Sequence, residues 1–336
     1  MIDWIARAFD AIHQWLFEQW LAPLLFNWDM AIYTEDAFVG LQWLLAGVLQ
    51  LLVMILILLP LERWRALEEI KDKAAVRVDM LYTLISRLGI FRLGLYFLVD
   101  PLWDELWSAW VVADWPKWQL DQNVAQLIGL QTFPAWGSFL LYLLVFDLVD
   151  YLIHRAQHQC RPWWALHATH HSQRQMTVFS DSRNHLLDDL LRDVIIANLG
   201  QLIGVGPEQF LAVVLAAQLV ENLSHINSKL PFGWLGERLV VSPRFHRLHH
   251  AMELGHEAQG KGTLGGCNFA VLFPCWDILF GTASFDDRYH PTGIRDQRSE
   301  EGAVDYGHGY WDQQRKGLQR LWACVGPAAF QTKNKS

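Results

Sequence analysis

Three apolar stretches of the chain have the length and pattern of membrane-spanning helices. Residues 38–60 carry no charge, and they exceed the roughly 20 residues that a helix needs to cross the hydrocarbon core of a bilayer. Residues 78–98 are also apolar but contain Arg87 and Arg92, and residues 135–153 are apolar apart from two aspartates. We therefore expect three spans, of which the second has the least regular pattern.

A fourth apolar region has the pattern of a helical hairpin. Residues 186–203 begin with charged turns and become apolar from Val194, and residues 207–223 are apolar over most of their length. Between them lie two glycines and Pro207. Glycine and proline interrupt helices, whereas proline is tolerated in a first helical turn. We expect a hairpin that returns to the side of the membrane from which it started.

The distribution of basic residues predicts how these helices are oriented. The loop at residues 61–77 has five Lys or Arg residues, whereas the segment before the first span has one, as does the Trp-rich segment 101–133. Basic residues gather again over residues 154–192. Because loops rich in Lys and Arg stay in the cytosol, we expect the N-terminus outside and residues 154–192 inside.

Composition supports the membrane interpretation and limits the class of partner. The chain is 52% hydrophobic and 18% charged, against roughly 25% charged residues in a typical soluble domain. Its net charge of −8 argues against nucleic acid as a partner. Residues 1–20 lack the basic start and the cleavage site of a signal peptide. Their amphipathic pattern predicts a helix that lies in the membrane interface or packs as an ordinary helix, and we expect a bacterial inner membrane.

Histidines are concentrated in the middle of the chain, where ten of the 14 lie between His154 and His250. One His-x-x-x-His pair and two His-x-x-His-His boxes recur there, the boxes on either side of the predicted hairpin. Imidazoles three or four residues apart share a helix face and can point at one ion. Eight imidazoles exceed the three or four of a single zinc site, so we expect two metal ions. The eight are His154, His158, His167, His170, His171, His246, His249 and His250.

Two more histidines and three acidic residues complete the candidate site. His185 and His225 flank the hairpin and are predicted to be further ligands. Asp150 and Asp147 precede His154 by one and two turns, and Glu221 precedes His225 by one turn. Metal-bound histidines usually donate their other N–H to an oxygen, so these carboxylates are candidates for that role. Asp147 can instead solvate the helix end, and Glu221 can bind metal directly, with Asn222 a weaker option. The other histidines are interpreted as surface or packed residues: His13, His256, His290 and His308.

In their order and spacing these motifs resemble the fatty acid hydroxylase/sterol desaturase superfamily. The resemblance rests on HRAQH (154–158), WALHATHHS (164–172), SPRFHRLHH (242–250), NFA (268–270) and WDILFGT (276–282), and it covers residues 139–282. It implies a membrane-embedded oxygenase, normally with two iron ions, that hydroxylates or desaturates lipids, sterols or carotenoids with O₂. It also implies that the eight histidines are ligands, with His185 and His225 at less regular family positions.

The sequence departs from the family pattern at a few positions. Some relatives have a fourth His-x-x-x-His box, in which Glu221 here replaces the first histidine. Alkylglycerol monooxygenases have Glu directly after the first box, where this chain has Gln159, and Ala270 replaces a usual glycine. No cytochrome b5-like domain is fused, so we expect a separate electron-transfer protein, cytochrome b5-like or ferredoxin-like.

Together these observations predict an all-α protein, an integral membrane helical bundle with a cytosolic histidine-rich helical cap that holds a di-metal site. We expect residues 1–134 to form an interfacial helix, two spans and the Trp-rich external loop. Residues 135–285 would be the catalytic domain, with the third span and the hairpin, and residues 286–336 a cytosolic tail.

The predicted activity is O₂-dependent hydroxylation, or else desaturation, of a lipid or sterol-like substrate by two Fe ions, with Zn as the metal that purification can leave instead. A membrane zinc-dependent lipid hydrolase, in which metal-bound water attacks an ester or amide, is one alternative. The other is a non-catalytic membrane protein that its metals stabilise.

Overall fold

Helices make up most of the structure. The computed structural model describes residues 2–90, 118–252 and 265–326, together with residues 105, 108–110 and 112–113. This part of the chain contains no β-strand, only two isolated bridges that pair Ala66 with Ser228 and Ala251 with Thr292. The expectation of an all-α protein is confirmed. The chain divides into two compact units, one of Met1–Val53 with Leu84–Asp114 and one of Met54–Thr83 with Trp115–Ser336.

The first unit begins with the helix expected over residues 1–20. Its elements are α1 (Ile2–Leu16), the π-helix η1 (Phe17–Leu21), α2 (Ala22–Asn27), the 3-10 helix η2 (Ala31–Tyr33) and α3 (Thr34–Val53). Trp4 and Trp15 of α1 are exposed, whereas His13 is buried. The Nε2 atom of His13 lies 2.8 Å from the carbonyl oxygen of Phe38. His13 is thus a packed histidine.

Two helices are long and apolar enough to cross a membrane, judged by length and composition. One is Ala31–Trp64, in which α3 continues through the π-helix η3 (Met54–Leu58) into α4 (Leu59–Trp64). Pro60 stands in the first turn of α4, directly after the π-helix η3. The other is α8 (Ala135–Gln159). These helices contain the first and third expected spans.

The second expected span begins within α5 (Lys73–Arg87). Its residues 91–98 lie outside the described residues, as do Trp103, Trp107 and Trp115 of the Trp-rich segment.

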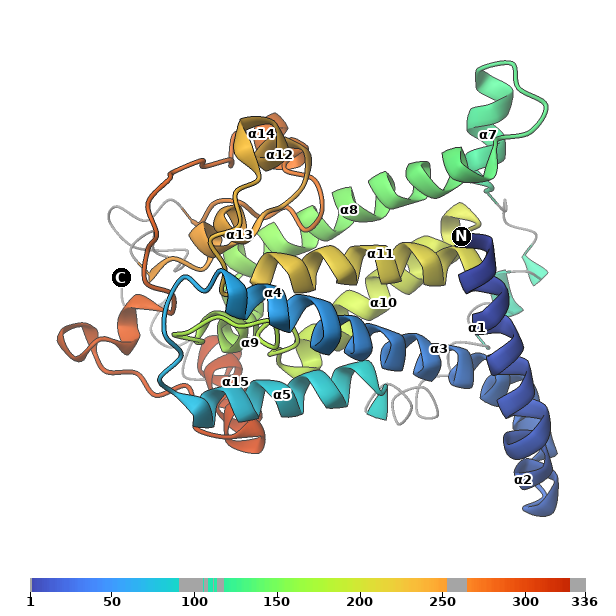
Figure 1. Cartoon of the computed structure of the whole chain (residues 1–336), viewed down its shortest axis with the longest axis horizontal. Helices are drawn as coiled ribbons and strands as arrows, with labels where there is room; N and C mark the ends of the chain where they lie inside the picture. Colours follow the sequence, from blue (N-terminus) through green and yellow to red (C-terminus); the bar gives the residue numbers. More distant parts are fainter. Residues whose placement is uncertain are drawn as a thin grey trace. The chain divides into compact units, whose positions relative to one another are not determined.

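Three long helices lie side by side in the second unit: α8, α10 (Leu186–Ile203) and α11 (Pro207–His225) (Figure 1). Their shared core includes Tyr142 and Phe146 of α8, Ile203 of α10, and Val213 of α11. The hairpin expected between α10 and α11 is present. Gly204 ends α10 in the left-handed conformation (φ 75°), which glycine adopts without strain. An added Cβ there would stand 2.2 Å from the carbonyl oxygen of Trp118.

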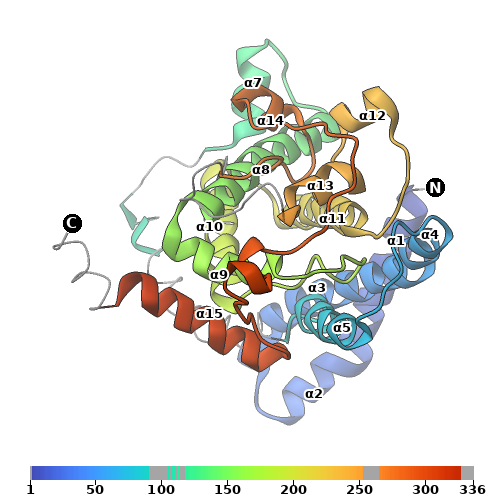
Figure 2. The same ribbon diagram turned by 90° about the vertical axis from the view of Figure 1, so that its left-hand side faces the viewer.

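Shorter helices gather around the C-terminal end of α8 (Figures 1 and 2). α9 packs against α8, α13 against α11, and the last helix, α15, along α9. The side of the membrane on which they lie stays a prediction. The elements of this unit not yet given are α7 (Leu120–Leu127), α9 (Arg161–His171), α12 (Gly233–Leu239), α13 (Pro243–His249), α14 (Cys275–Phe280), η5 (Arg295–Gln297), η6 (Ser299–Glu301) and α15 (Tyr310–Val325).

Candidate metal centre

The first two predicted ligands lie in the last two turns of α8. His154 and His158 are four residues apart and therefore share a helix face, which is buried. After Gly137 the helix has no glycine or proline to interrupt it. It ends at Cys160, whose backbone is extended (φ −91°, ψ 107°).

The two His-x-x-His-His boxes lie at the C-terminal ends of short helices, each of which has a proline in its first turn. Pro162 stands in the first turn of α9, and Pro243 in that of α13. Ser242 caps α13, because its Oγ accepts a hydrogen bond from the backbone N–H of Phe245 at 3.0 Å. These starts set the helix phase so that the histidines of both boxes are buried.

Eight of the predicted histidines come together in two groups of four. Within each group, one nitrogen of every ring lies within 4.8 Å of the corresponding nitrogens of the others, and all eight residues are buried. The first group consists of His154, His158, His171 and His249, and the second group consists of His170, His225, His246 and His250.

Each His-x-x-His-His box is divided between the two groups. Neighbouring side chains on a helix point about 100° apart, so His171 joins the first group and His170 the second. In α13, His249 joins the first group and His246 the second. The two groups are therefore adjacent, and the ring centroids of His170 and His171 are 5.3 Å apart.

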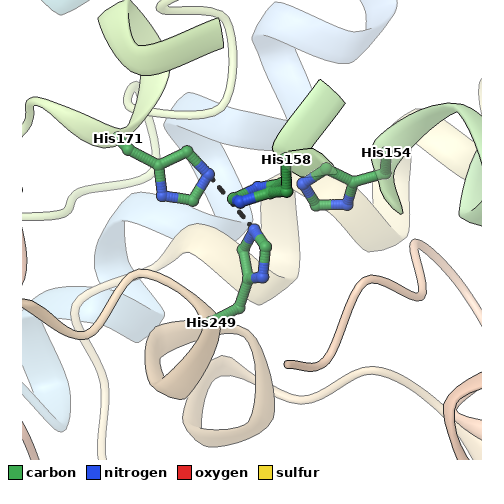
Figure 3. A group of neighbouring side chains, drawn as sticks. All are labelled: His154, His158, His171 and His249. Atoms are coloured by element: carbon green, nitrogen blue, oxygen red, sulfur yellow. Dashed lines mark hydrogen bonds between the residues drawn. The ribbon is translucent and has the colours of Figure 1, made fainter. Parts of the chain in front are cut away.

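The rings converge within each group, as Figure 3 shows for the first. There the Nε2 atoms of His249 and His171 are 3.2 Å apart. In the second group, the Nε2 atom of His246 lies 3.0 Å from that of His225 and 3.1 Å from that of His250. Nitrogens that each lie roughly 2.1 Å from one metal ion are about 3.0 to 3.4 Å from one another, for angles at the metal between 90° and the tetrahedral value, so this spacing fits a shared ion.

Backbone carbonyls fix the protonation of three of these rings. The Nδ1 atom of His154 lies 2.8 Å from the carbonyl oxygen of Phe269, and that of His249 lies 2.7 Å from the carbonyl oxygen of Cys267. The Nδ1 atom of His225 lies 2.8 Å from the carbonyl oxygen of Glu221. A carbonyl only accepts, so each Nδ1 donates, and each Nε2 turns a lone pair toward its group.

The buried ring nitrogens are better satisfied by a bound metal ion than by hydrogen bonds to one another. Burial lowers the pKa of His170, His246 and His250 well below the usual range, so these rings are neutral at pH 7. The Nε2 atom of His154 is buried and has no hydrogen-bond partner. A buried nitrogen without a partner is costly, and a cation bound by the lone pairs removes that cost.

His167 lies beside both groups. Its ring centroid is 5.2 Å from that of His154 and 5.3 Å from that of His170. Its Nδ1 lies 2.9 Å from a carboxylate oxygen of Asp188, while its Nε2 is buried without a hydrogen-bond partner. His167 is thus oriented as a ligand is, at a position from which it could serve either ion.

Asp188 is a residue that sequence reasoning missed. Besides His167, it accepts hydrogen bonds from Gln157 (2.6 Å) and from the indole of Trp163 (2.7 Å). In the sequence it is one of several charged residues in the first turns of the hairpin. Nothing in the local pattern distinguishes it from Asp189.

His185 lies outside both groups. It caps α10, where its Nδ1 accepts a hydrogen bond from the backbone N–H of Leu187 at 3.1 Å. Its Nε2 lies 2.9 Å from the carbonyl oxygen of Gln314 in α15. Because both ring nitrogens are used in this way, the geometry gives His185 a structural contact in place of the predicted ligand role.

The predicted acidic residues make specific contacts of other kinds. Asp150 forms a two-armed ion pair with Arg192 of α10, and the carboxylate of Glu221 contacts the same guanidinium at 3.1 Å. Glu221 orients His225 through its backbone carbonyl. Asp147 accepts hydrogen bonds from the backbone N–H of Leu272 and of Phe273, and it therefore anchors the segment that follows the third box.

The C-terminal motif shapes that segment. Asp277 accepts hydrogen bonds from the backbone N–H of Phe269 and of Ala270. Asn268 stands in the left-handed region (φ 58°), which asparagine tolerates better than most residues. Its side chain bonds to the backbone of Phe245 and Ser284. The motif thus places the carbonyl of Phe269 against His154.

The remaining histidines that the structure describes stand apart from the two groups. His290 lies 3.3 Å from Asp286, and the side chain of His308 is 90% exposed. His256 lies outside the described residues.

Fold and site together define a helical protein with two candidate membrane helices and two adjacent, buried four-histidine groups suited to transition metals. Residues 139–282 match the model of the fatty acid hydroxylase family. All eight histidines of the two groups lie within the matched residues.

The chain is similar to several proteins that are named as lipid enzymes. It is 28% identical to an ornithine lipid hydroxylase of Rhizobium tropici over 48% of this chain, and 25% identical to an alkylglycerol monooxygenase of Caenorhabditis elegans over 50%. It is 26% identical to a very-long-chain aldehyde decarbonylase of Oryza sativa over 73%.

These matches differ in how much of each relative they cover. The chain spans 46% of the length of the ornithine lipid hydroxylase, 30% of the alkylglycerol monooxygenase and 85% of the aldehyde decarbonylase. No solved structure matches the chain significantly.

Proposed function

We propose that this protein is a membrane-bound lipid hydroxylase that uses O₂ and holds two iron ions in its two four-histidine groups. One observation carries the proposal: eight buried imidazoles converge in two adjacent groups, and carbonyls of the chain turn ring nitrogens inward. Imidazole binds Fe, Zn, Cu and Ni alike, so the imidazole ligands alone do not identify the metal. The choice of iron rests on the family resemblance.

The similar proteins support a substrate with a long apolar part. Their names describe an ornithine lipid, an alkylglycerol and very-long-chain aldehydes. An apolar substrate of this kind suits a site at the end of the long apolar helix α8. We favour hydroxylation over desaturation, because two of the three names describe a hydroxylase or monooxygenase.

The metal ions would supply O₂ activation and the oxidation of an unactivated C–H bond. Hydroxylation inserts one oxygen atom into that C–H bond and reduces the other to water, and it consumes two electrons and two protons. A separate cytochrome b5-like or ferredoxin-like protein would supply the electrons. It would act from the cytosolic side predicted by the loop charges, at the inner membrane if the protein is bacterial.

The chain's own residues hold and shield the metals. The first group would hold one ion and the second group the other, with His167 beside both. The carbonyls of Phe269 and Cys267 in the first group, and of Glu221 in the second, keep ligand rings in one tautomer. Burial keeps bulk water from the histidines, and it lowers the pKa of His170, His246 and His250 so that these rings are neutral at pH 7.

Metal analysis under anaerobic conditions tests the proposal. The full chain would be purified without O₂, its metals counted, and O₂ then added with a reductant and candidate lipids. Two irons per chain and a lipid product that gains one oxygen atom only when O₂ is present are expected. Stoichiometric zinc with an O₂-independent hydrolysis product would instead support a membrane zinc hydrolase, and bound metal without any turnover would support a non-catalytic protein.

A further inference from the structure

Three charged side chains join the long helices that carry the metal ligands. Arg192 of α10 donates from Nε and Nη2 to the two carboxylate oxygens of Asp150 in α8, at 2.8 and 3.0 Å. The same Nη2 donates to Glu221 of α11 at 3.1 Å. The side chain of Asp150 is 7% exposed and that of Glu221 is 15% exposed, against 29% for Arg192. One guanidinium therefore links α8 to α11 across α10.

Each of the two carboxylates stands one helical turn before a proposed ligand. Asp150 precedes His154 of the first group by four residues, and Glu221 precedes His225 of the second group by four. A turn of helix between a carboxylate and a histidine is stiff, because its backbone hydrogen bonds hold it. A shift of α8 against α11 at the level of Arg192 would therefore move a ligand of one group relative to a ligand of the other.

We infer that Arg192 is a positioning residue that sets the spacing between the two metal sites. The inference rests on the proposed function only in that two ions must be bound. Guanidinium is a planar fork that holds one carboxylate with two parallel bonds and can still reach a second carboxylate. An ammonium group has the same charge but lacks that fork. Charge and geometry can therefore be separated by exchanging Arg192 for lysine.

The test compares metal–metal spacing in wild-type protein and in Arg192→Lys, with the full chain stripped of metal and reloaded anaerobically with ferrous iron. X-ray absorption measures the metal–metal distance, and a titration measures the affinity for the second ion. In Arg192→Lys we expect a lengthened or smeared metal–metal signal and an affinity for the second ion about tenfold lower. Unfolding temperature and elution volume would show that the variant is folded.

Arg244→Lys is the matched control. The side chain of Arg244 is 28% exposed, and it stands two residues before His246. It pairs with Glu237 at 3.3 Å, a contact between two short helices that does not join α8 to α11. We expect this variant to keep the wild-type metal–metal signal. Glu221→Gln, which weakens only one arm of the bridge, should change the signal in the same direction as Arg192→Lys but less.

An unchanged metal–metal distance and an unchanged second-ion affinity in Arg192→Lys would overturn the inference. So would an equal change in Arg244→Lys, because the effect would then reflect a general loosening. The proposed function fails in a different way. Wild-type protein that binds two zinc ions and oxidises no lipid would contradict that function, yet zinc–zinc spacing would still report on Arg192.

Discussion

The protonation of single imidazoles decides whether the two histidine groups can bind metal. In both groups, a backbone carbonyl accepts a hydrogen bond from the Nδ1–H of at least one ring, so that the lone pair of its Nε2 points toward the group. For His167 the carboxylate of Asp188 plays that part. Removing a ligand or its hydrogen-bond acceptor should therefore lower metal binding with little change in the fold.

The variant His170→Ala should lose the metal ion of the second group and lose lipid oxidation, because His170 is one of the four rings of that group. The membrane fold should remain. Metal content per chain and product formation measure the effect, with the exposed His308→Ala as the control. Wild-type metal content in His170→Ala would show that His170 is not a ligand.

The variant Asp188→Asn should weaken metal binding by about 10- to 100-fold, the usual effect of losing the acceptor behind a ligating histidine. A neutral amide holds the Nδ1–H of His167 less strongly, and its NH₂ group can also face the donors of Gln157 and Trp163. Titration of metal-free protein measures the affinity. The exposed Asp287→Asn serves as the control, and equal affinities in the two variants would exclude the role proposed for Asp188.

Metal-free protein should lose stability as the pH falls below about 6.5, the ordinary pKa of histidine. Burial lowers the pKa of His170, His246 and His250, so the unfolded chain takes up protons that the folded chain does not. The stability from these groups is fully present above the unfolded pKa, and it falls by about 1.4 kcal/mol per pH unit for each such proton.

Unfolding temperatures of the metal-free chain between pH 7.5 and 5.5 (~two pH units around the histidine pKa) measure this dependence. The dependence should be shallower in His170→Gln and unchanged in His308→Ala. If the stability does not decrease as the pH is lowered, the buried rings take up protons as readily as exposed ones.

The sequence predicts the residues of the site better than their arrangement. Spacing alone indicates the histidines of the boxes, because i, i+3 and i+4 positions share a helix face. It does not show that His170 and His171 join different groups, since that depends on how α9 packs against α8 and how α13 packs against α11. The contacts of His185 with Gln314 and of His167 with Asp188 join distant parts of the chain, and no local pattern reveals them.

At the scale of elements, α15 contacts both α9, which carries the second histidine box, and the start of α10. Arg320 of α15 donates to the carbonyl oxygen of Ala165 in α9 and to the hydroxyl of Thr169. Gln314 accepts the N–H of Leu186 at the start of α10. This helix lies beyond the residues that match the family model.

Gly317→Ala tests how closely α15 packs against the start of α10. An added Cβ would stand 2.3 Å from the Cδ2 atom of His185 and 2.9 Å from its Nε2. Overpacking of this kind costs about 1–3 kcal/mol, so the unfolding temperature should fall. Leu318→Ala changes an exposed neighbour and should have little effect. An unchanged unfolding temperature in Gly317→Ala would mean that α15 is not tightly seated.

The long elements were predictable because their apolar patterns are long and uninterrupted. The first and third expected spans, and the hairpin with its turn at Gly204, appear where the sequence placed them. The order in which short helices pack around the end of α8 was not predictable. Their positions depend on contacts such as Asp147 with the backbone at Leu272, which join residues 125 positions apart.

At the scale of the whole molecule, the long apolar helix α8 carries part of the two buried histidine groups at one end. Such a layout would let a membrane lipid approach from the bilayer while a soluble electron donor approaches from the other side. The predicted orientation places that donor in the cytosol. Both the substrate and the donor belong to the proposed function, so they share its central claim: that O₂ is the source of the atom added to a lipid.

The most direct test of that claim is the source of the oxygen atom in the product. Purified, iron-loaded protein would be given a lipid substrate and a reductant under ¹⁸O₂ in ordinary water, and the product's mass would be measured. The proposed function predicts one ¹⁸O atom in the hydroxylated lipid and none in protein with His170→Ala. A product whose added oxygen comes from water, or one that forms equally well without O₂, would contradict it.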